Sequence, residues 1–388
     1  MKNKNIIMII ILLSIFTALL YFTACKKDID ITLPISNDSE YNETTENCSY
    51  YSQLFIPINQ TIMFQTFNPQ SFLLGTNTQT GLVIPMCKDP ICNHKNMACV
   101  FVKAQIFITV TYKNRIYWVE DGNTIVSTDE QGLDKKVQYK NDGNSIIEFI
   151  VNDKYIYFSQ IDGEKVANIY RLDLKTGKAE CMTKENEDNF YTPLFFAGDY
   201  IYWKENSINL FISDINFKNT QAFYNIENNS IKNTNKDWFQ TDGEKMYYLN
   251  FKKSDDNNYD YNLNLMCSDL DGKNEKLLVE NVFCFWVTDQ HIFFSYFNKD
   301  YEAMKSKEIF DEINGKIYCM NKDGGEIKPV FDRPGFYICS RYEVYGSYIY
   351  CFVVDTENEG DGISTLTYPF KIKINSDKPP EELYYNLY

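Results

Sequence analysis

The sequence predicts an all-β protein that is built from one repeated unit of four short strands. A strand-like segment, in which aromatic residues follow an apolar one, recurs along the chain, and a second strand-like segment follows it in most units. The copies of the first segment are 115–118, 155–158, 200–203, 245–248, 291–294 and 348–351. Counted from the third residue of each copy, the steps are 40, 45, 45, 46 and 57 residues. This period is typical of one blade of a β-propeller.

The second segment alternates apolar and polar residues, as expected of a half-buried strand. Its copies are 168–173, 209–214 and 264–269, with looser copies at 124–129 and 316–321. Turn dipeptides that favour positive φ follow, as in Asp271-Gly272 and Asp323-Gly324. Further strands are expected before the aromatic segments, for example at 147–151, 194–197 and 283–287. Four strands and three turns per period exclude a helical solenoid.

The units follow one another without a Pro-rich or Ser-rich linker, so we predict one closed domain over residues 48–388. Six units lie between about residues 105 and 385. A seventh is expected upstream, with strands at 53–58, 61–65, 71–74 and 81–86. We therefore predict a β-propeller with seven blades. The diverged first unit and an insertion at 299–312, which is expected to hold a short helix, leave six or eight blades as alternatives.

Most of the 30 Tyr and 28 Phe residues are predicted to fill the space between blades, because aromatic strands bury large rings there. Trp118 and Trp203 belong to the aromatic repeat and are predicted to be core residues. Trp238 and Trp286 lie in strands that are expected to line the central channel. Seven cysteines mostly lie in strands and are predicted to be small buried residues: Cys48, Cys181, Cys267, Cys284, Cys319, Cys339 and Cys351.

The amino terminus resembles a bacterial lipoprotein signal. Lys2 and Lys4 precede an apolar run over 6–22, and small residues lead directly to Cys25. The resemblance implies a signal peptide over residues 1–24 and a diacylglycerol group on Cys25. An uncleaved anchor helix is one alternative, although the apolar run is at the lower limit for spanning a bilayer. Simple secretion is the other, but it would make the position of Cys25 directly after Thr23-Ala24 a coincidence. The polar stretch 25–47 has no periodic pattern, which predicts a flexible tether.

The net charge of −15 limits the possible partners. Removal of the segment before Cys25 takes away two lysines and leaves about −17. Such a charge disfavours non-specific binding of nucleic acid and of anionic lipid. We therefore expect no nucleic-acid partner, and attachment to the cell membrane, on its extracytoplasmic face, through the amino-terminal lipid.

One local cluster has the residue types of a metal site. Cys87, Cys92, His94 and Cys99 follow a C-x4-C-x-H-x4-C spacing. Three thiols and an imidazole can supply the four ligands of a closed, structural Zn²⁺ site. Outside the membrane, two of the thiols could instead form a disulfide, and unligated thiols are a third interpretation. The spacing is not that of a standard zinc finger.

The lipoprotein signal, the cysteine-histidine segment and the aromatic strands together resemble uncharacterised propeller lipoproteins of clostridia and related bacteria. Their propeller is similar to the YWTD repeats of the low-density lipoprotein receptor group. Tyr117-Trp118 and Tyr202-Trp203 match the first half of that motif, whereas Val119-Glu120 and Lys204-Glu205 depart from its second half. The resemblance implies the fold and the membrane location, and no particular activity.

Catalytic motifs are absent from the sequence. His94 lies in the cysteine cluster and His291 at a strand start, which leaves no histidine for a Ser-His-Asp triad. There is no P-loop, dinucleotide fingerprint or zinc-protease motif. The sequence therefore favours a binding or scaffolding module for a protein or glycan partner over an enzyme. A carbohydrate-active enzyme or a sugar-binding protein is the alternative, because the chain is rich in Tyr and in carboxylates.

Overall fold

The computed structural model describes residues 55–58, 60–65, 73–78, 83–87, 109–161, 166–183, 189–206, 209–225, 239–251, 263–296, 312–354, 367–376 and 378–383. The chain divides into two units, 1–39 and 40–388, and all of these residues belong to the second. Every regular element among them is a β-strand, which confirms the all-β prediction. The described residues contain no helix with the length and apolar character needed to cross a membrane.

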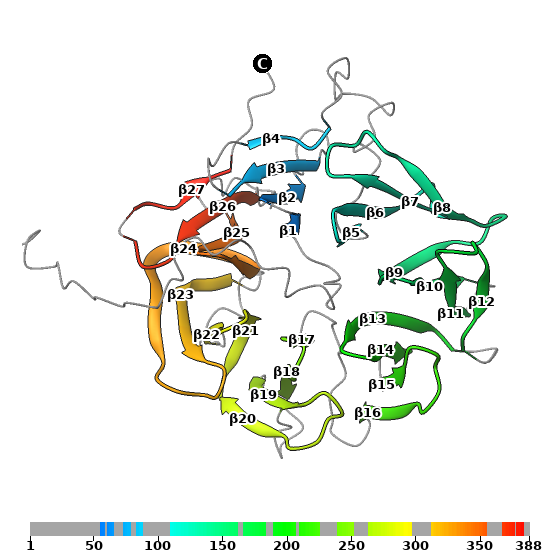
Figure 1. Cartoon of the computed structure of the whole chain (residues 1–388). Coiled ribbons are helices and arrows are strands. Elements are labelled where there is room, and N and C mark those ends of the chain that lie inside the picture. The colour runs from blue at the N-terminus through cyan, green and yellow to red at the C-terminus, as the bar shows by residue number, and fades with distance from the viewer. Residues whose placement is uncertain are drawn as a thin grey trace, which may run out of the picture. The chain divides into compact units, whose positions relative to one another are not determined.

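Five antiparallel sheets each contain four strands that are consecutive in the chain, and each sheet is one blade (Figure 1). Blades one to three are β1 (Phe55–Ile58), β2 (Thr61–Gln65), β3 (Leu73–Asn77) and β4 (Val83–Pro85); β5 (Thr109–Tyr112), β6 (Arg115–Glu120), β7 (Thr124–Asp129) and β8 (Lys136–Lys140); and β9 (Ile146–Val151), β10 (Tyr155–Ile161), β11 (Ala167–Asp173) and β12 (Ala179–Cys181). Blades four and five are β13 (Tyr191–Ala197), β14 (Tyr200–Glu205), β15 (Asn209–Asp214) and β16 (Gln221–Asn225); and β17 (Phe239–Thr241), β18 (Lys245–Phe251), β19 (Leu263–Asp269) and β20 (Lys276–Val279).

The sixth sheet has seven strands and provides two blades. They are β21 (Val282–Val287), β22 (His291–Tyr296), β23 (Glu312–Asn321), β24 (Lys328–Tyr345), β25 (Tyr348–Val354), β26 (Thr367–Lys373) and β27 (Glu381–Glu382). The first part of β24 pairs with β23 and its last part pairs with β25. β24 is therefore the outermost strand of blade six and the innermost strand of blade seven. The protein is a seven-bladed β-propeller, as predicted.

The antiparallel order places the connections on two different faces of the propeller. The first-to-second and third-to-fourth strand turns leave one edge of each blade, which we call the turn face. The longest of these is 374–380. The second-to-third and blade-to-blade connections leave the opposite edge, the loop face, and several are longer: 86–108, 226–238, 252–262, 297–311 and 355–366. The insertion at 299–312 was predicted to hold a short helix. Residues 299–311 lie outside the described residues, and Glu312 is the first residue of β23.

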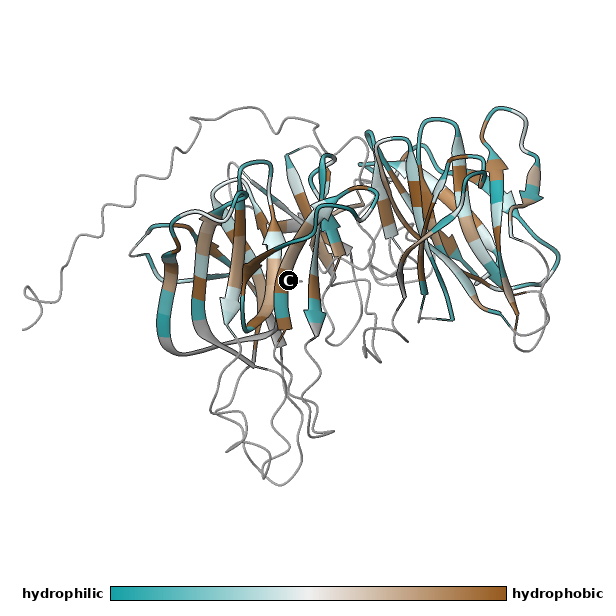
Figure 2. Ribbon diagram, turned by 90° about the horizontal axis from the view of Figure 1, so that it is seen from below, coloured by the Kyte–Doolittle hydropathy of each residue, from teal (hydrophilic) through white to brown (hydrophobic). Residues whose placement is uncertain are grey.

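The core lies between adjacent blades, where apolar strand residues face one another, and the turns are hydrophilic (Figure 2). The central tyrosines of the aromatic repeat are buried, with Tyr157 and Tyr202 fully so. The Tyr157 ring of blade three meets Phe196 of blade four edge-on, with 5.5 Å between ring centroids. Trp118 and Trp203 are buried as predicted. Burial of rings on both sides of each blade links the blades into one core.

The third strand of several blades ends at an aspartate that closes the following turn. Asp214 Oδ1, for example, accepts hydrogen bonds from the backbone N–H groups of Asn216 and Lys218, at 2.8 and 3.0 Å. In blades five and six, the residue three positions after this aspartate or its asparagine equivalent has a positive φ, which Gly272 (79°) and Gly324 (84°) adopt as predicted. In blade four the same position holds Phe217, with φ 55°.

Candidate functional site

The predicted cysteine-histidine site is only partly within the described residues. Cys87 follows blade one and is buried in a hydrophobic cluster that includes Met86 and Trp118. Cys92, His94, Cys99 and the predicted lipidation residue Cys25 lie outside the described residues. The described part of the chain contains no group of three or more His, Cys, Asp or Glu side chains that could hold a metal ion.

Other sequence-predicted residues have mainly structural contacts. Trp286 lies on the innermost strand β21, but its ring is buried against Tyr345, and its Nε1 donates to the Val344 carbonyl at 3.0 Å. It therefore joins blades six and seven instead of facing a ligand in the channel. Trp238 lies outside the described residues. Cys319 and Cys351 are buried as predicted, whereas Cys181 is exposed because it lies on the outermost strand of blade three.

His291 is half-buried and begins β22, which confirms its predicted place at a strand start. Its backbone N–H donates to Thr288 Oγ1 at 3.0 Å, and the Thr288 hydroxyl donates to the His291 carbonyl at 3.0 Å. Burial lowers the pKa of the imidazole, and the nearby Asp289 carboxylate opposes that shift. These contacts close a turn.

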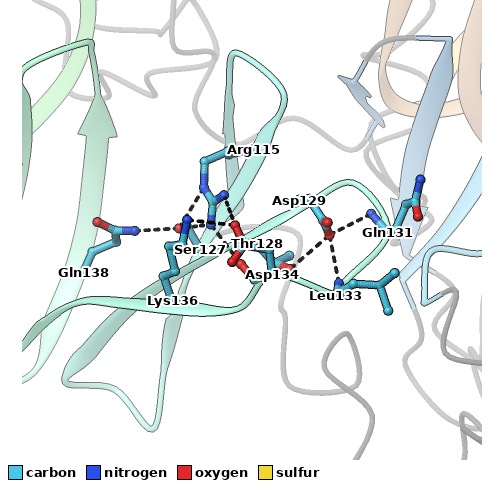
Figure 3. A network of polar contacts seen from close by, with 9 residues as sticks. All are labelled: Arg115, Ser127, Thr128, Asp129, Gln131, Leu133, Asp134, Lys136 and Gln138. Atoms are coloured by element: carbon cyan, nitrogen blue, oxygen red, sulfur yellow. Dashed lines mark hydrogen bonds and ion pairs between the residues drawn. The ribbon is translucent and has the colours of Figure 1, made fainter.

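A polar network surrounds Ser127 on the turn face of blade two (Figure 3). Arg115 donates to Ser127 Oγ from Nε at 3.2 Å and from Nη2 at 3.0 Å, and Gln138 Nε2 donates to the same oxygen at 2.7 Å. Arg115 Nη1 also binds Asp134 Oδ2 at 2.9 Å. Hydrogen bonds from Lys136 and Arg115 lower the pKa of the Asp134 carboxyl. These neighbours of Ser127 donate protons and do not accept one, so the network fixes the turn and does not activate a nucleophile.

A buried carboxylate links blades five and six at the turn face. Asp242 Oδ2 lies 2.6 Å from Lys322 Nζ, and Tyr247 donates its hydroxyl to the same oxygen at 3.0 Å. Burial raises the pKa of Asp242, but the Lys322 amine and the backbone N–H groups of Lys245 and Glu244 outweigh it and lower the pKa overall. An ionised, fully bonded carboxylate of this kind is a structural link between blades.

The loop face carries a repeated polar position that the sequence analysis missed. This position is the third residue after the central tyrosine of the aromatic repeat. In blades two, three, four and five it holds Glu120, Gln160, Glu205 and Asn250, respectively. Each lies at the end of the second strand, where the connections of the loop face begin. Glu120 Oε2 pairs with Lys135 Nζ at 2.6 Å, and Gln160 Oε1 accepts from Asn141 Nδ2 of blade two at 3.0 Å. Alignment of the repeats would have found this position.

Glu205 lies in a cluster of asparagines on the loop face of blade four. Its two carboxylate oxygens accept hydrogen bonds from Asn189 Nδ2 at 2.9 Å and Asn209 Nδ2 at 3.1 Å. Asn206 Nδ2 donates to Asn189 Oδ1 at 2.9 Å. Asn209 Oδ1 is buried and has no hydrogen-bond partner among the described residues. We call Asn189, Glu205, Asn206 and Asn209 the Glu205 cluster; its amides and carboxylate are groups that bind hydroxyls and peptide groups.

Comparison with known proteins agrees with the fold. No protein-family model matches the chain, and no curated protein matches it in sequence. An oligogalacturonate lyase from Vibrio parahaemolyticus is similar with a TM-score of 0.53 and 9% identity, over 81% of this chain and 89% of that one. An oligogalacturonate lyase in complex with manganese is similar with a TM-score of 0.56 and 10% identity, over 84% and 90%.

The β-propeller domain of the Trilobed protease from Pyrococcus furiosus aligns at 13% identity with a TM-score of 0.46, over 87% of this chain and 98% of that one. At these identities, the likeness to the two lyases shows a shared fold alone. The propeller part of the predicted resemblance is confirmed. The resemblance to clostridial lipoproteins has no support from a family model or a sequence match and stays a prediction.

Proposed function

We propose that this protein is a lipid-anchored, extracytoplasmic propeller that binds a protein or glycan partner at its loop face. The observation that supports this most is the difference between the two faces. The turn face is closed by short turns that are bonded internally, whereas the loop face has the longer connections and the Glu205 cluster. Rigid scaffolds that present longer connections on one face are typical of binding modules.

Glu205→Gln tests the binding face. The substitution removes the charge of the Glu205 cluster and keeps its size, so we expect at least about tenfold weaker binding, the equivalent of 1.4 kcal/mol. Binding is measured on glycan arrays and by pull-down from solubilised membranes. Lys273→Ala is the control, because Lys273 is exposed on the turn face and pairs with Asp271 of the same turn. Weaker binding by Lys273→Ala, together with unchanged binding by Glu205→Gln, would place the partner on the turn face.

The net charge of −15 supports a partner that is neutral or basic, since it repels polyanions over long range. The anchor is proposed from the sequence of the amino terminus. Cys25→Ser should release the protein from membranes or leave it unprocessed, and should abolish incorporation of labelled palmitate. Unchanged labelling in this variant would contradict the assignment of Cys25.

A carbohydrate-active enzyme is the second candidate, because two proteins of similar fold are oligogalacturonate lyases. Incubation with oligogalacturonate, with and without Mn²⁺, tests this directly. The acidic chain should repel this anionic substrate, so we expect no cleavage. Turnover that is lost on substitution of one acidic residue, while the fold survives, would replace the binding-module proposal.

Structural Zn²⁺ at Cys87, Cys92, His94 and Cys99 is a further part of the proposal. Thiolate ligands must lose protons to bind, so metal loss should increase as the pH falls. Elemental analysis of the purified protein should find about one zinc per chain. Cys92→Ser should abolish it. A disulfide among the three cysteines in a non-reduced peptide map, with no zinc, would favour the alternative interpretation.

A further inference from the structure

The loop face of blade six carries an exposed aromatic side chain. Among the described residues, six large hydrophobic side chains are more than a third exposed. Five of them lie in the turns of the turn face or within two residues of one: Leu133, Val137, Tyr200, Leu277 and Ile327. The sixth, Tyr296, is 39% exposed and is the last residue of β22, where a connection of the loop face begins. Tyr296 is therefore the exposed ring that a ligand on the described part of the loop face would meet.

Tyr296 occupies the repeated position that holds polar residues in blades two to five. It is the third residue after Phe293, which is the central residue of the aromatic repeat in blade six. Blades two to five have a carboxylate or an amide at this position, so the fold of a blade does not require an aromatic ring there. The ring is a property of blade six alone among these five blades.

Two further rings hold Tyr296 in place. The Tyr318 ring of β23 lies at a centroid distance of 5.0 Å from it, with 69° between the ring planes. The fully buried Phe294 ring lies at 5.3 Å, with 88° between the planes, and itself stacks on Tyr318 at 5.8 Å. Because the ring is already fixed on one side, a ligand that packs on its exposed part would cost little side-chain entropy.

Polar groups lie beside this ring. Tyr296 is opposite Val282 in the pairing of β21 with β22 (Figure 1), and Glu280 and Asn281 directly precede Val282. Glu280 is exposed and Asn281 is half-buried. A register shift after Val282 makes Phe283, which is partly exposed, the extra residue of a β-bulge, a feature that changes the direction of a side chain. We call Glu280, Asn281, Phe283 and Tyr296 the Tyr296 platform.

We propose that the Tyr296 platform binds one ring of a neutral saccharide. The faces of a sugar ring are C–H surfaces that pack on an aromatic ring, and its edge carries hydroxyl groups. A carboxylate accepts hydrogen bonds from such hydroxyls, and an amide both donates and accepts them. The inference rests on the proposed function, because it takes the loop face as the binding face.

The surroundings of the platform favour a neutral sugar over an anionic one and over a protein. Ser295 donates its hydroxyl to the Lys316 carbonyl at 3.0 Å, and Lys316 Nζ pairs with Asp332 at 3.2 Å. With Glu280, these described charged groups are net negative and repel an anion. A stable protein interface buries roughly 800 Å² on each partner around several anchor residues. One exposed ring with two polar neighbours is closer in size to a single sugar ring.

Tyr296→Ala tests the platform, with Tyr200→Ala as the matched control. Tyr200 is 40% exposed at the start of β14, on the turn face. The probe is an array of neutral oligosaccharides of glucose, galactose, mannose and N-acetylglucosamine, and the affinity of the full chain for the glycan bound best is measured by calorimetry. Tyr296→Ala should weaken its binding by at least about tenfold. Tyr296→Phe keeps the ring and should change it by less than about twofold. Tyr200→Ala should leave it unchanged.

A second variant keeps the test independent of the fold. Asn281 has a φ of 59°, which glycine adopts without strain, so Asn281→Gly removes the amide and keeps the backbone. It should weaken binding of the same glycan by about threefold or more. Urea midpoints of all variants show whether a loss of binding is a loss of folding.

The outcomes separate this inference from the proposed function. Weaker glycan binding by Glu205→Gln, together with unchanged binding by Tyr296→Ala and Asn281→Gly, would overturn the platform and keep the loop face as the binding face. An array with no bound neutral glycan would also overturn the platform, and a protein captured through the loop face would then leave the proposed function intact. Weaker binding by Tyr200→Ala alone would place the glycan on the turn face and contradict both.

Discussion

At the scale of single residues, the tyrosine hydroxyls of the aromatic repeat tie neighbouring blades together. Tyr157 of blade three donates to the Ile215 carbonyl in a turn of blade four, and Tyr202 of blade four donates to the Leu270 carbonyl in the equivalent turn of blade five. Arg171 Nη1 also binds the Ile215 carbonyl, at 3.1 Å. The Ile215 carbonyl therefore accepts hydrogen bonds from both Tyr157 and Arg171.

Removal of the Tyr202 hydroxyl and removal of the Tyr157 hydroxyl should lower the free energy of unfolding by different amounts. Tyr202→Phe should lower the free energy of unfolding by about 1 kcal/mol, because the half-buried Leu270 carbonyl loses this donor. Tyr157→Phe should cost less, since Arg171 still binds that carbonyl. Tyr→Ala at either position should cost about 3–5 kcal/mol through loss of the buried ring. Urea unfolding measures all four variants. A larger loss for Tyr157→Phe than for Tyr202→Phe would contradict the compensation.

Phe217 is a residue-scale exception to the turn pattern. A φ of 55° is unfavourable for a bulky side chain, and the equivalent positions in blades two, five and six are glycines with positive φ. The ring stacks on Trp203 at 5.7 Å and on Tyr157 at 6.0 Å, which offsets the strain. Phe217→Ala removes the ring and keeps the strain, whereas Phe217→Gly removes both. Phe217→Gly should therefore be more stable than Phe217→Ala by about 1 kcal/mol in thermal unfolding. The reverse order would show that this turn is not strained.

At the scale of elements, the pair of Asp242 and Lys322 connects two turns of adjacent blades. Its carboxyl pKa lies below the usual value, so its stabilisation is present above about pH 3.9 and is lost as the pH falls through the folded-state pKa. Asp242→Asn should destabilise the protein by about 2 kcal/mol at pH 7, between the values for exposed and buried pairs. It should also make acid unfolding less steep, as followed by circular dichroism. An unchanged acid transition would contradict this role.

The elements also show what sequence patterns can and cannot predict. Thr61–Gln65 was predicted with its observed bounds, because its apolar run is bounded by polar residues. The predicted strand at 194–197 begins three residues too late, because β13 continues through Pro193 to Tyr191. Pro193 is accommodated because β13 is an innermost strand with a bulge there, where a missing N–H is tolerated. Asp242 and Lys322 are far apart in sequence, so no local pattern could pair them. Among 53 acidic residues, composition alone could not indicate that Glu343 is buried.

At the scale of the whole molecule, each blade buries its faces only against its neighbours. Trp118 of blade two packs with Ile56, Ile58 and Met63 of blade one, and on the other side Phe55 packs against blade seven. Blade one therefore completes the core on both sides, although it is a small part of the chain. Fold stability should depend on it far more than its length suggests.

Deletion of residues 48–87 tests this dependence. The deletion exposes the Trp118 face of blade two and the rings of Tyr350 and Phe352 on blade seven, both of which are buried in the intact ring. We expect a much lower urea midpoint, binding of a dye specific for exposed apolar surface, and self-association, because large exposed apolar patches drive aggregation. A control deletion of the predicted tether, residues 26–47, removes only chain that precedes the first predicted blade and should leave the midpoint unchanged. A monomeric six-bladed product with the stability of the intact protein would show that the ring can close without blade one, and that closure does not depend on the contacts of Phe55.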